Sequence, residues 1–280
     1  YPGAVQPLAT AATLTKMETV NINPNVALAI DNRLSVGVGF DALYGKARYN
    51  SDILGTTLFN NKLSAWGYGW NAGVLYQFTH HTRFGVSYRS EVTVDAEGRS
   101  DAIVPGGVAF SNNTLNAALD LPAMTIVSFY SDVTTHWSIM ASAYYTQWNV
   151  FDNLILANTA LFPTITVHEN YRNTWNYSFG AHYRMTHSIT LKAGIGWDET
   201  PTQDGFRDVR LPDAKRFAVA IGGHFQFMRA VGLDLGWTHF FTKAVNVNNN
   251  LSTLPAFLVT QGTAKIDVNV VGAQLTVQLN

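Results

Sequence analysis

The sequence contains no cysteine, which excludes disulfide bridges, thiol catalysis and cysteine-ligated zinc sites. Charged residues make up only 13% of its 280 residues, and the formal net charge is −1. No polybasic patch is evident along the chain, which argues against a nucleic-acid partner. There is also no run of about 18 apolar residues, so a helical membrane span is excluded. The mean hydropathy of +0.02 is the value expected when apolar and polar residues alternate and cancel.

Such alternation runs through nearly the whole chain. The clearest instance extends from Arg83 to Ala96, where Phe84, Val86 and Tyr88 share one face with two later valines. The opposite face carries charges in mid-strand, and no helical segment is evident that could cover the apolar face. We therefore predict an all-β, transmembrane antiparallel β-barrel with lipid outside and a wet lumen inside. A soluble β-sandwich is the main structural alternative.

Eleven segments carry this pattern, and most exceed the roughly nine to eleven residues that a tilted transmembrane strand needs. They are joined in rotation by tight turns, which we expect on the periplasmic side, and by long loops, which we expect outside. The predicted strands are Thr15–Ile30, Leu34–Tyr49, Trp66–Phe78, Arg83–Ala96, Leu121–Ser131, Trp137–Phe151, Thr174–Met185, Ile189–Trp197, Arg216–Phe227, Val231–Phe241 and Ala264–Leu279. The tight turns are Asp31–Arg33, Thr79–Thr82, Asp132–His136, Thr186–Ser188 and Met228–Ala230.

The strand count is odd, whereas bacterial single-chain barrels have even numbers of strands. The first and last strands both run inward, which leaves the N-terminal end on the outer side. We therefore expect an N-terminal part with an odd number of strands to be absent from this chain. On this interpretation residues 1–14 are the remnant of an outer loop and residues 15–280 form the transmembrane barrel domain.

All seven tryptophans lie in or at the ends of the predicted strands. This placement is typical of the aromatic girdles at the two membrane interfaces. The alternative is that aromatic residues simply favour strands in any β protein.

Two regions resemble the long-chain fatty acid transporter (FadL) family of outer membranes. The first is Gly67–Tyr76 together with Tyr88–Val92. The second is more specific, because it is similar to that family's Asp-x-Ser/Thr-Pro loop and to its Arg, Pro-Asp and Arg at the same spacings. In this chain those residues are Asp198–Pro201, Arg207, Leu211–Asp213 and Arg216 with Phe217.

The resemblance implies a fourteen-strand barrel in the outer membrane of a Gram-negative bacterium, with an N-terminal hatch that plugs the lumen. This chain would then lack the hatch and the first three strands. Val167 precedes His168 and Glu169 at a place where some fatty acid transporters have a basic residue thought to meet the carboxylate. Relatives that take up aromatic hydrocarbons share the barrel, so a neutral apolar substrate stays open.

The outer loops are unusually apolar for a general porin. Segments Ile103–Phe110, Leu154–Thr166 and Leu251–Val259 could form a groove for a hydrophobic ligand, with Phe110, Phe162 and Phe257 as candidate contacts. Alternatively, these loops close a small core of their own.

The lumen face offers a second set of ligand candidates. On the strand that begins at Trp137, the large side chains of Met140, Tyr144 and Trp148 share one face and are expected to point inward. They line an apolar pocket, or they pack against a hatch. The inward charges Arg89, Glu91 and Lys192 are expected to form ion pairs within the wall.

The segment from Asp198 to Arg216 is expected to be a gating loop. Pro201 and Pro212 restrict its backbone, and Arg207, Asp213 and Arg216 can fold it back onto the barrel mouth through charge-assisted hydrogen bonds. A direct contact of Arg207 or Arg216 with a ligand carboxylate is the alternative.

Catalysis finds little support, because the eight histidines are scattered without the spacing of a zinc site or a catalytic triad. We expect no catalytic residue, no metal and no cofactor. The leading hypothesis is passive uptake of hydrophobic molecules, with long-chain fatty acids first. The alternatives are an aromatic hydrocarbon channel, a non-transporting adhesin or scaffold, and a polar-solute porin. The expected partners are a hydrophobic small molecule, outer-membrane lipid and lipopolysaccharide, with no nucleic acid and a monomeric barrel.

Overall fold

The computed structural model describes residues 12–53, 55–228, 230–249 and 260–277 of the chain. Antiparallel strands account for almost all of the regular structure of these residues, and the single exception is the 3-10 helix η1 (Trp148–Val150). Among the described residues, no helix is long and apolar enough to cross a membrane. The strands are β1 (Leu14–Ile22), β2 (Asn25–Ala29), β3 (Leu34–Ile53), β4 (Thr57–Thr79), β5 (Thr82–Arg89), β6 (Asp95–Val104), β7 (Val108–Ala118), β8 (Met124–Asp132), β9 (Trp137–Thr146), β10 (Asn153–Ala157), β11 (Thr164–His168), β12 (Thr174–Arg184), β13 (Ile189–Asp198), β14 (Arg216–Met228), β15 (Val231–Thr242), β16 (Val245–Asn249), β17 (Thr260–Ala264) and β18 (Val268–Val277).

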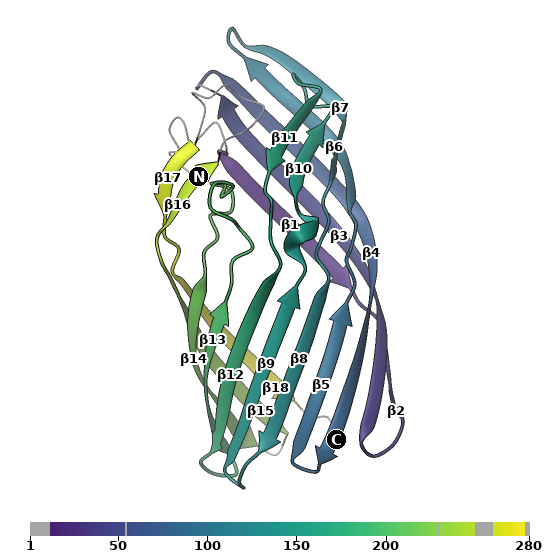
Figure 1. The fold of residues 1–280 in the computed structure, drawn as a ribbon, viewed down its shortest axis with the longest axis vertical. Coiled ribbons are helices and arrows are strands. Elements are labelled where there is room, and N and C mark those ends of the chain that lie inside the picture. The colour runs from purple at the N-terminus through teal and green to yellow at the C-terminus, as the bar shows by residue number, and fades with distance from the viewer. Residues whose placement is uncertain (1–11, 54, 229, 250–259, 278–280) are drawn as a thin grey trace.

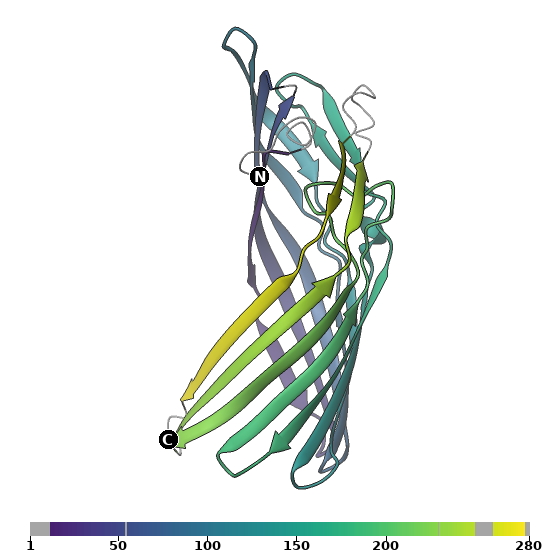
Figure 2. The same cartoon turned by 90° about the vertical axis from the view of Figure 1, so that its left-hand side faces the viewer.

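Eleven antiparallel strand positions build a curved wall, as the alternation predicts (Figures 1 and 2). Their order is β1 with β2, then β3, β4, β5, β8, β9, β12, β13, β14, β15 and β18. β1 and β2 occupy one position because both pair with β3. They are separated at Asn23 and Pro24, and proline cannot donate a hydrogen bond to the ladder. In the described residues the wall is an open trough whose edges are the β1–β2 position and β18.

Four of the predicted tight turns, those that precede β3, β5, β9 and β13, lie at the lower end of the wall in Figure 1, and the fifth, Met228–Ala230, includes a position outside the described residues. In the turn between β2 and β3, the carboxylate oxygen Oδ1 of Asp31 accepts hydrogen bonds from the backbone N–H groups of Arg33 (2.6 Å) and Leu34 (2.8 Å). An aspartate that binds the backbone two and three residues ahead fixes a short turn without further packing. By the loop-length rule for bacterial barrels, this is the end of the wall that is expected to face the periplasm.

Side chains alternate between the two faces of the wall. Six of the seven tryptophans are exposed on the outer face, and only Trp148 turns inward. The rings of Trp175 and Tyr145 lie 4.8 Å apart near the upper end of the wall, and those of Trp137 and Tyr183 lie 4.8 Å apart near the lower end. Two bands of paired aromatic rings on the outer face are the arrangement expected at the two interfaces of a membrane.

An outer sheet extends beyond the wall, and the sequence analysis missed it. The lower half of β4 pairs with β5, whereas its upper half pairs with β6, and the sheet continues through β7, β10 and β11. The predicted strand Arg83–Ala96 was therefore wrong, because β5 ends at Arg89 and a new strand begins at Asp95. The predicted strand Trp137–Phe151 likewise ends early, at Thr146.

Between β5 and β6 the chain crosses the inner face of β4. Val92 and Val94 are buried there against Gly67 and Gly69. A Cβ atom on Gly67 would lie 2.6 Å from Val92 Cγ1 and 2.7 Å from Val94 Cγ2, closer than real Cβ contacts occur. These two glycines therefore allow the crossing segment to lie directly on the strand.

The outer sheet has its own hydrophobic core. Leu115 of β7 is completely buried, and it packs with residues from β3, β4, β6, β10 and β11. The predicted apolar loop Leu154–Thr166 is mostly the β10–β11 hairpin, in which Leu154 and Leu156 face this core. Residues 103–110 likewise lie across the β6–β7 hairpin. The apolar residues of the β10–β11 hairpin thus serve partly to stabilise the outer sheet.

Candidate functional site: the inner cavity

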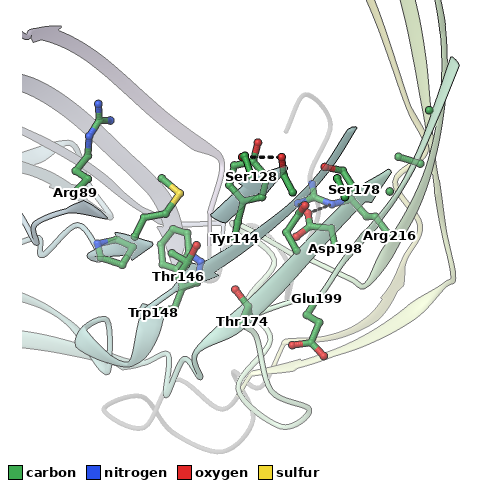
Figure 3. Close-up of a pocket in the computed structure, with 18 of the residues that line it drawn as sticks. Arg89, Ser128, Tyr144, Thr146, Trp148, Thr174, Ser178, Asp198, Glu199 and Arg216 are labelled. Carbon is green, nitrogen blue, oxygen red and sulfur yellow. Dashed lines mark hydrogen bonds and ion pairs between the residues drawn. The ribbon is translucent and has the colours of Figure 1, made fainter. Parts of the chain in front are cut away.

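A cavity of about 1170 Å³ lies on the inner face of the wall. It is lined by side chains from β5, β8, β9, β12, β13 and β14, and by the loop that follows β13. Figure 3 shows Arg89 on one side of this space, the pair Asp198 and Arg216 on the other, and Tyr144 and Trp148 between them. This volume is slightly above the roughly 300–1,000 Å³ of pockets that hold small molecules.

The structure brings together the three predicted lumen residues of the β9 region. Met140 and Tyr144 lie on the inward face of β9, and Trp148 lies on η1 just beyond it. The ring of Trp148 makes an edge contact with the buried Tyr171, with centroids 6.1 Å apart. Together they give one side of the cavity a large apolar and aromatic surface.

Small polar side chains line another part of the cavity, and the sequence analysis did not single them out. Ser128 and Ser142 share a 2.8 Å hydrogen bond across β8 and β9, and Thr174, Asn176 and Ser178 project from alternate positions of β12. The sequence contains a signal for them, because these β12 positions alternate on one face of the strand together with the polar residues His182 and Arg184. Small side chains here leave the space that the aromatic residues border.

Arg89 takes part in a network on the inner wall. Its Nη2 atom lies 3.7 Å from Oδ1 of the buried Asp41 on β3. Asp41 also accepts hydrogen bonds from the side-chain amides of Asn21 (2.7 Å) and Asn71 (2.9 Å). Glu91 was predicted to share the inward face of the same strand, but it lies beyond the end of β5, is exposed and does not line the cavity.

Asp198 and Arg216 form an ion pair at the upper rim of the cavity. They are directly opposite each other on β13 and β14, and Arg216 Nε lies 3.0 Å from Asp198 Oδ2. The Arg216 guanidinium also lies over the ring of Phe240, 5.8 Å from its centroid, and 3.9 Å from Oδ1 of Asp213. Asp198 and Arg216 are the last residue pair of the β13–β14 ladder, so their ion pair lies where the wall meets the loop.

The loop between these two residues folds back onto the barrel mouth. The hydroxyl of Thr200 donates to Asp213 Oδ2 at 2.8 Å, and the carbonyl of Pro201 accepts from the backbone N–H of Arg172 at 3.0 Å. Pro212 lies half-buried beside Asp213 at the second bend. The first contact closes the loop on itself, and the second ties it to the segment that precedes β12.

Arg207 is the buried centre of the loop. Its guanidinium donates to Asp204 (2.6 Å), to the backbone carbonyl of Asp213 (2.9 Å) and to the backbone carbonyl of Asn246 on β16 (3.1 Å). Its donors are directed at the protein itself, and only 4% of the side chain is exposed. Arg216, with 36% of its side chain exposed, is the more accessible of the two arginines that were considered as carboxylate contacts.

Lys192 lies in the lower half of the wall. Its Nζ atom lies 2.6 Å from Asp234 Oδ1, and Nδ1 of His224 lies 2.9 Å from the other carboxylate oxygen of the same residue. This three-strand cluster spans β13, β14 and β15, so the expected pairing of inward charges is present on this side as well.

A buried carboxyl group behind the outer mouth was not predicted. Glu169 is almost fully buried near Tyr171, Asp208 and Arg210. Burial, and then the negative charge of Asp208, raise the pKa of Glu169 to about 8. The preceding Val167 is only 1% exposed and belongs to the core of the outer sheet, which explains why an apolar residue occupies that position.

The candidate ligand residues of the outer loops lie apart from this cavity. Phe110 on β7 is 42% exposed, and Phe162 in the β10–β11 turn is 38% exposed and stacks on Phe59 with centroids 5.9 Å apart. Neither lines the cavity. Phe257 lies outside the described residues.

A ligand-sized interior within an antiparallel wall that carries two outer aromatic bands defines a class of protein, the outer-membrane β-barrels that bind or pass small molecules. Residues 7–279 match the family of outer membrane protein transport proteins described as OMPP1/FadL/TodX. The chain belongs to this family, and it is therefore an outer-membrane protein of a Gram-negative bacterium with a transmembrane β-barrel fold.

Curated relatives agree with this assignment. The chain is 29% identical over 267 residues to the long-chain fatty acid transport protein of Salmonella typhi, covering 84% of this chain and 61% of the relative. It is 27% identical over 278 residues to the protein of the same description in Escherichia coli K12, covering 84% and 62%. Outer membrane protein P1 of Haemophilus influenzae is 26% identical over 265 residues, covering 83% and 58%. The chain thus spans about three fifths of the length of these relatives, which are transport or outer-membrane proteins and not enzymes.

Solved structures share the fold. A FadL homologue from Pseudomonas aeruginosa has a TM-score of 0.86 at 21% identity, covering 96% of this chain and 70% of that one. The toluene transporter TbuX of Ralstonia pickettii has a TM-score of 0.69 at 15% identity, covering 97% and 73%. At these identities the likeness establishes the fold alone.

Proposed function

We propose that the protein is a passive outer-membrane transporter that takes up hydrophobic molecules, with long-chain fatty acids as the first candidate substrate. The observation that carries the proposal is the inner cavity with its apolar surface of Met140, Tyr144 and Trp148. An acyl chain gains free energy by leaving water for such a surface, at roughly 25 cal/mol for each Å² of apolar area that is buried. No energy source is required, because differences in binding drive each transfer.

Fatty acids rank first because two of the three curated relatives named above are long-chain fatty acid transport proteins. A neutral aromatic hydrocarbon is the second candidate, and a specific observation favours it. The position before His168 holds the core residue Val167, so no cation is available there for a carboxylate. Toluene transporters also share this fold.

The loop between Asp198 and Arg216 is proposed to act as a gate at the outer rim of the cavity. It is held by the buried Arg207 on one side and by the Asp198–Arg216 pair on the other. Movement of the loop would break charged contacts at the rim while it leaves the β13–β14 ladder intact. A ligand carboxylate could compete with Asp198 for the half-exposed Arg216, which would couple ligand entry to loop release.

Uptake of oleate and of toluene by a deletion host that expresses the full-length protein tests the proposal. We expect uptake of at least one of these substrates, and a severalfold loss of that uptake in Tyr144→Ala. Tyr177→Ala is the matched control, because Tyr177 is an exposed tyrosine on the outer face of β12. Each rate is normalised to the amount of folded protein in the outer membrane.

Failure to restore uptake of either substrate would refute the proposal. An adhesin or scaffold would hold no ligand in the cavity. An acyl chain that copurifies with the wild type and is lost in Tyr144→Ala would therefore argue against that alternative. A polar-solute porin would instead give steady ion conductance that Tyr144→Ala does not lower.

A further inference from the structure

Four basic side chains form one continuous row across the outer part of the wall. Strand pairing places Lys16 of β1 opposite Arg48 of β3, Arg48 opposite Lys62 of β4, and Lys62 opposite Arg99 of β6. All four side chains are exposed, and we call them the cationic row. These residues are far apart in the sequence, so a basic cluster forms on the folded surface although none is present along the chain.

The cationic row faces away from the cavity. Side chains alternate along β3, and the odd-numbered Asp41 and Leu43 line the cavity, so the even-numbered Tyr44 and Arg48 point outward. The register with β4 agrees, because Tyr44 is opposite the exposed Trp66. β1, β3, β4 and β6 lie side by side in Figure 1, so their outer faces form one surface.

The height of the row relative to the membrane follows from the aromatic residues below it. The rings of Tyr44 and Trp66 are 5.1 Å apart and belong to the upper aromatic band. Lys62 precedes Trp66 by four residues on the same face, which is about 14 Å along the strand and about 10 Å in height at a tilt of about 40°. The cationic row therefore lies at the level of the headgroups of the outer leaflet.

Salt bridges lie at the ends of the row, whereas Glu18 and Asp101 act on the middle residues Arg48 and Lys62 only at longer range. Lys16 Nζ lies 2.8 Å from Glu18, and Arg99 Nε lies 2.7 Å from Asp101. Within the described part of the chain, neither Arg48 nor Lys62 forms a salt bridge, although the two are directly opposite each other. Like charges directly opposite on neighbouring strands are destabilising, and an anion between them removes that repulsion.

We propose that Arg48 and Lys62, with Lys16 and Arg99 on either side, bind the phosphate groups of lipid A, the phosphorylated acyl anchor of lipopolysaccharide. Arginine presents a planar fork that matches phosphate, and lysine adds a compact charge. Lipid A fits both parts of this surface, the cationic row and the exposed aromatic residues below it. Its phosphates lie at the height of the cationic row, and its acyl chains extend down over the exposed Trp66, Tyr68 and Phe40. A soluble acidic partner would use only the upper part.

Binding of lipid A to the purified protein tests the proposal. The protein is freed of lipopolysaccharide in detergent micelles and titrated with bis-phosphorylated lipid A, and bound lipid is counted by native mass spectrometry. Dephosphorylated lipid A with the same acyl chains is the second probe. We expect tight binding of the phosphorylated lipid and much weaker binding of the dephosphorylated one.

Substitutions locate the contact. Near an anionic lipid surface each Lys or Arg contributes roughly a factor of five to affinity, so Lys62→Gln should weaken binding about fivefold and Arg48→Gln with Lys62→Gln about thirtyfold. Arg33→Gln removes the same single charge from an exposed periplasmic turn and should change affinity less than about twofold. The charge-preserving exchange Arg48→Lys with Lys62→Arg should retain most of the binding.

Folding of each variant is checked independently by heat-modifiable gel mobility. Loss of the like-charge contact should leave the lipid-free melting temperature of Arg48→Gln with Lys62→Gln unchanged or raised. Equal affinity for the two lipids would overturn the proposal, and so would equal losses in Lys62→Gln and Arg33→Gln.

Discussion

Gly67 carries a specific packing prediction, because the chain crosses β4 directly above it. In Gly67→Ala the new Cβ atom would meet two valine methyl groups at 2.6 and 2.7 Å and the backbone carbonyl oxygen of Thr93 at 3.0 Å. Favourable contacts between carbon atoms lie at about 3.5–4.0 Å, so residues 90–94 must move by about 1 Å. Overpacking of this kind costs about 1–3 kcal/mol.

The cost should appear locally, because the crossing segment leads into the β6–β7 hairpin. A change of 1–3 kcal/mol corresponds to an increase of about 5- to 150-fold in the amide hydrogen-exchange rates of residues 90–121, if these amides exchange by local opening. The lower strands should keep the exchange rates of the wild type.

Gly45→Ala is the matched control, because it places alanine on the neighbouring strand β3 with one contact, to Thr19 Cγ2 at 3.9 Å. Both substitutions reduce the flexibility of the unfolded chain equally, so the difference between them isolates the overpacking. Identical exchange in the two variants would refute the close approach of residues 90–94 to β4.

Two further predictions concern the outer mouth. Because burial and Asp208 raise the pKa of Glu169 to about 8, the folded protein keeps a proton that the unfolded chain releases near the ordinary value of 4.5. The stability of the wild type should therefore fall as the pH rises from about 5 to 8. Glu169→Gln stays neutral, so its melting temperature should change less than that of the wild type over this pH range. The same pH dependence of the melting temperature in both proteins would contradict the assignment. Arg207→Gln removes the contacts to Asp204 and to the carbonyl of Asn246, so limited proteolysis should cut residues 199–215 several times faster than in wild type, and unchanged cleavage would show that Arg207 does not hold the loop.

The eleven wall strands could be predicted from the sequence because lipid and lumen impose opposite polarity on the two faces of every strand. Turns such as Asp31–Arg33 could be predicted because their chemistry is local. The inward direction of Met140 and Tyr144 followed from the same period of two. For these features a residue and its near neighbours contain all the necessary information.

The outer sheet could not be predicted in this way. Val92 and Val94 have the same even-numbered spacing as Phe84, Val86 and Tyr88, with only Ser90 breaking the apolar series, yet they pack on the inner face of β4 and not against lipid. An alternating pattern states that one face is buried, but it does not state which partner buries it. The buried Glu169 was missed for a related reason, since its surroundings come from a loop about forty residues further along the chain.

The fold also limits where a hydrophobic ligand can first be captured. Three apolar residues of the β10–β11 hairpin, Leu154, Leu156 and Val167, are buried in the core of the outer sheet and are unavailable to a ligand. Other apolar residues of the outer sheet remain exposed, among them Ile155 and Phe162 of the hairpin and Phe110 of β7. Because β4 runs without a break from this sheet into the membrane wall, these exposed residues are held in fixed positions relative to the cavity. Any capture surface in the described outer sheet therefore consists of separate apolar residues in fixed positions. The larger continuous apolar surface for an acyl chain is the part of the cavity formed by Tyr144 and Trp148.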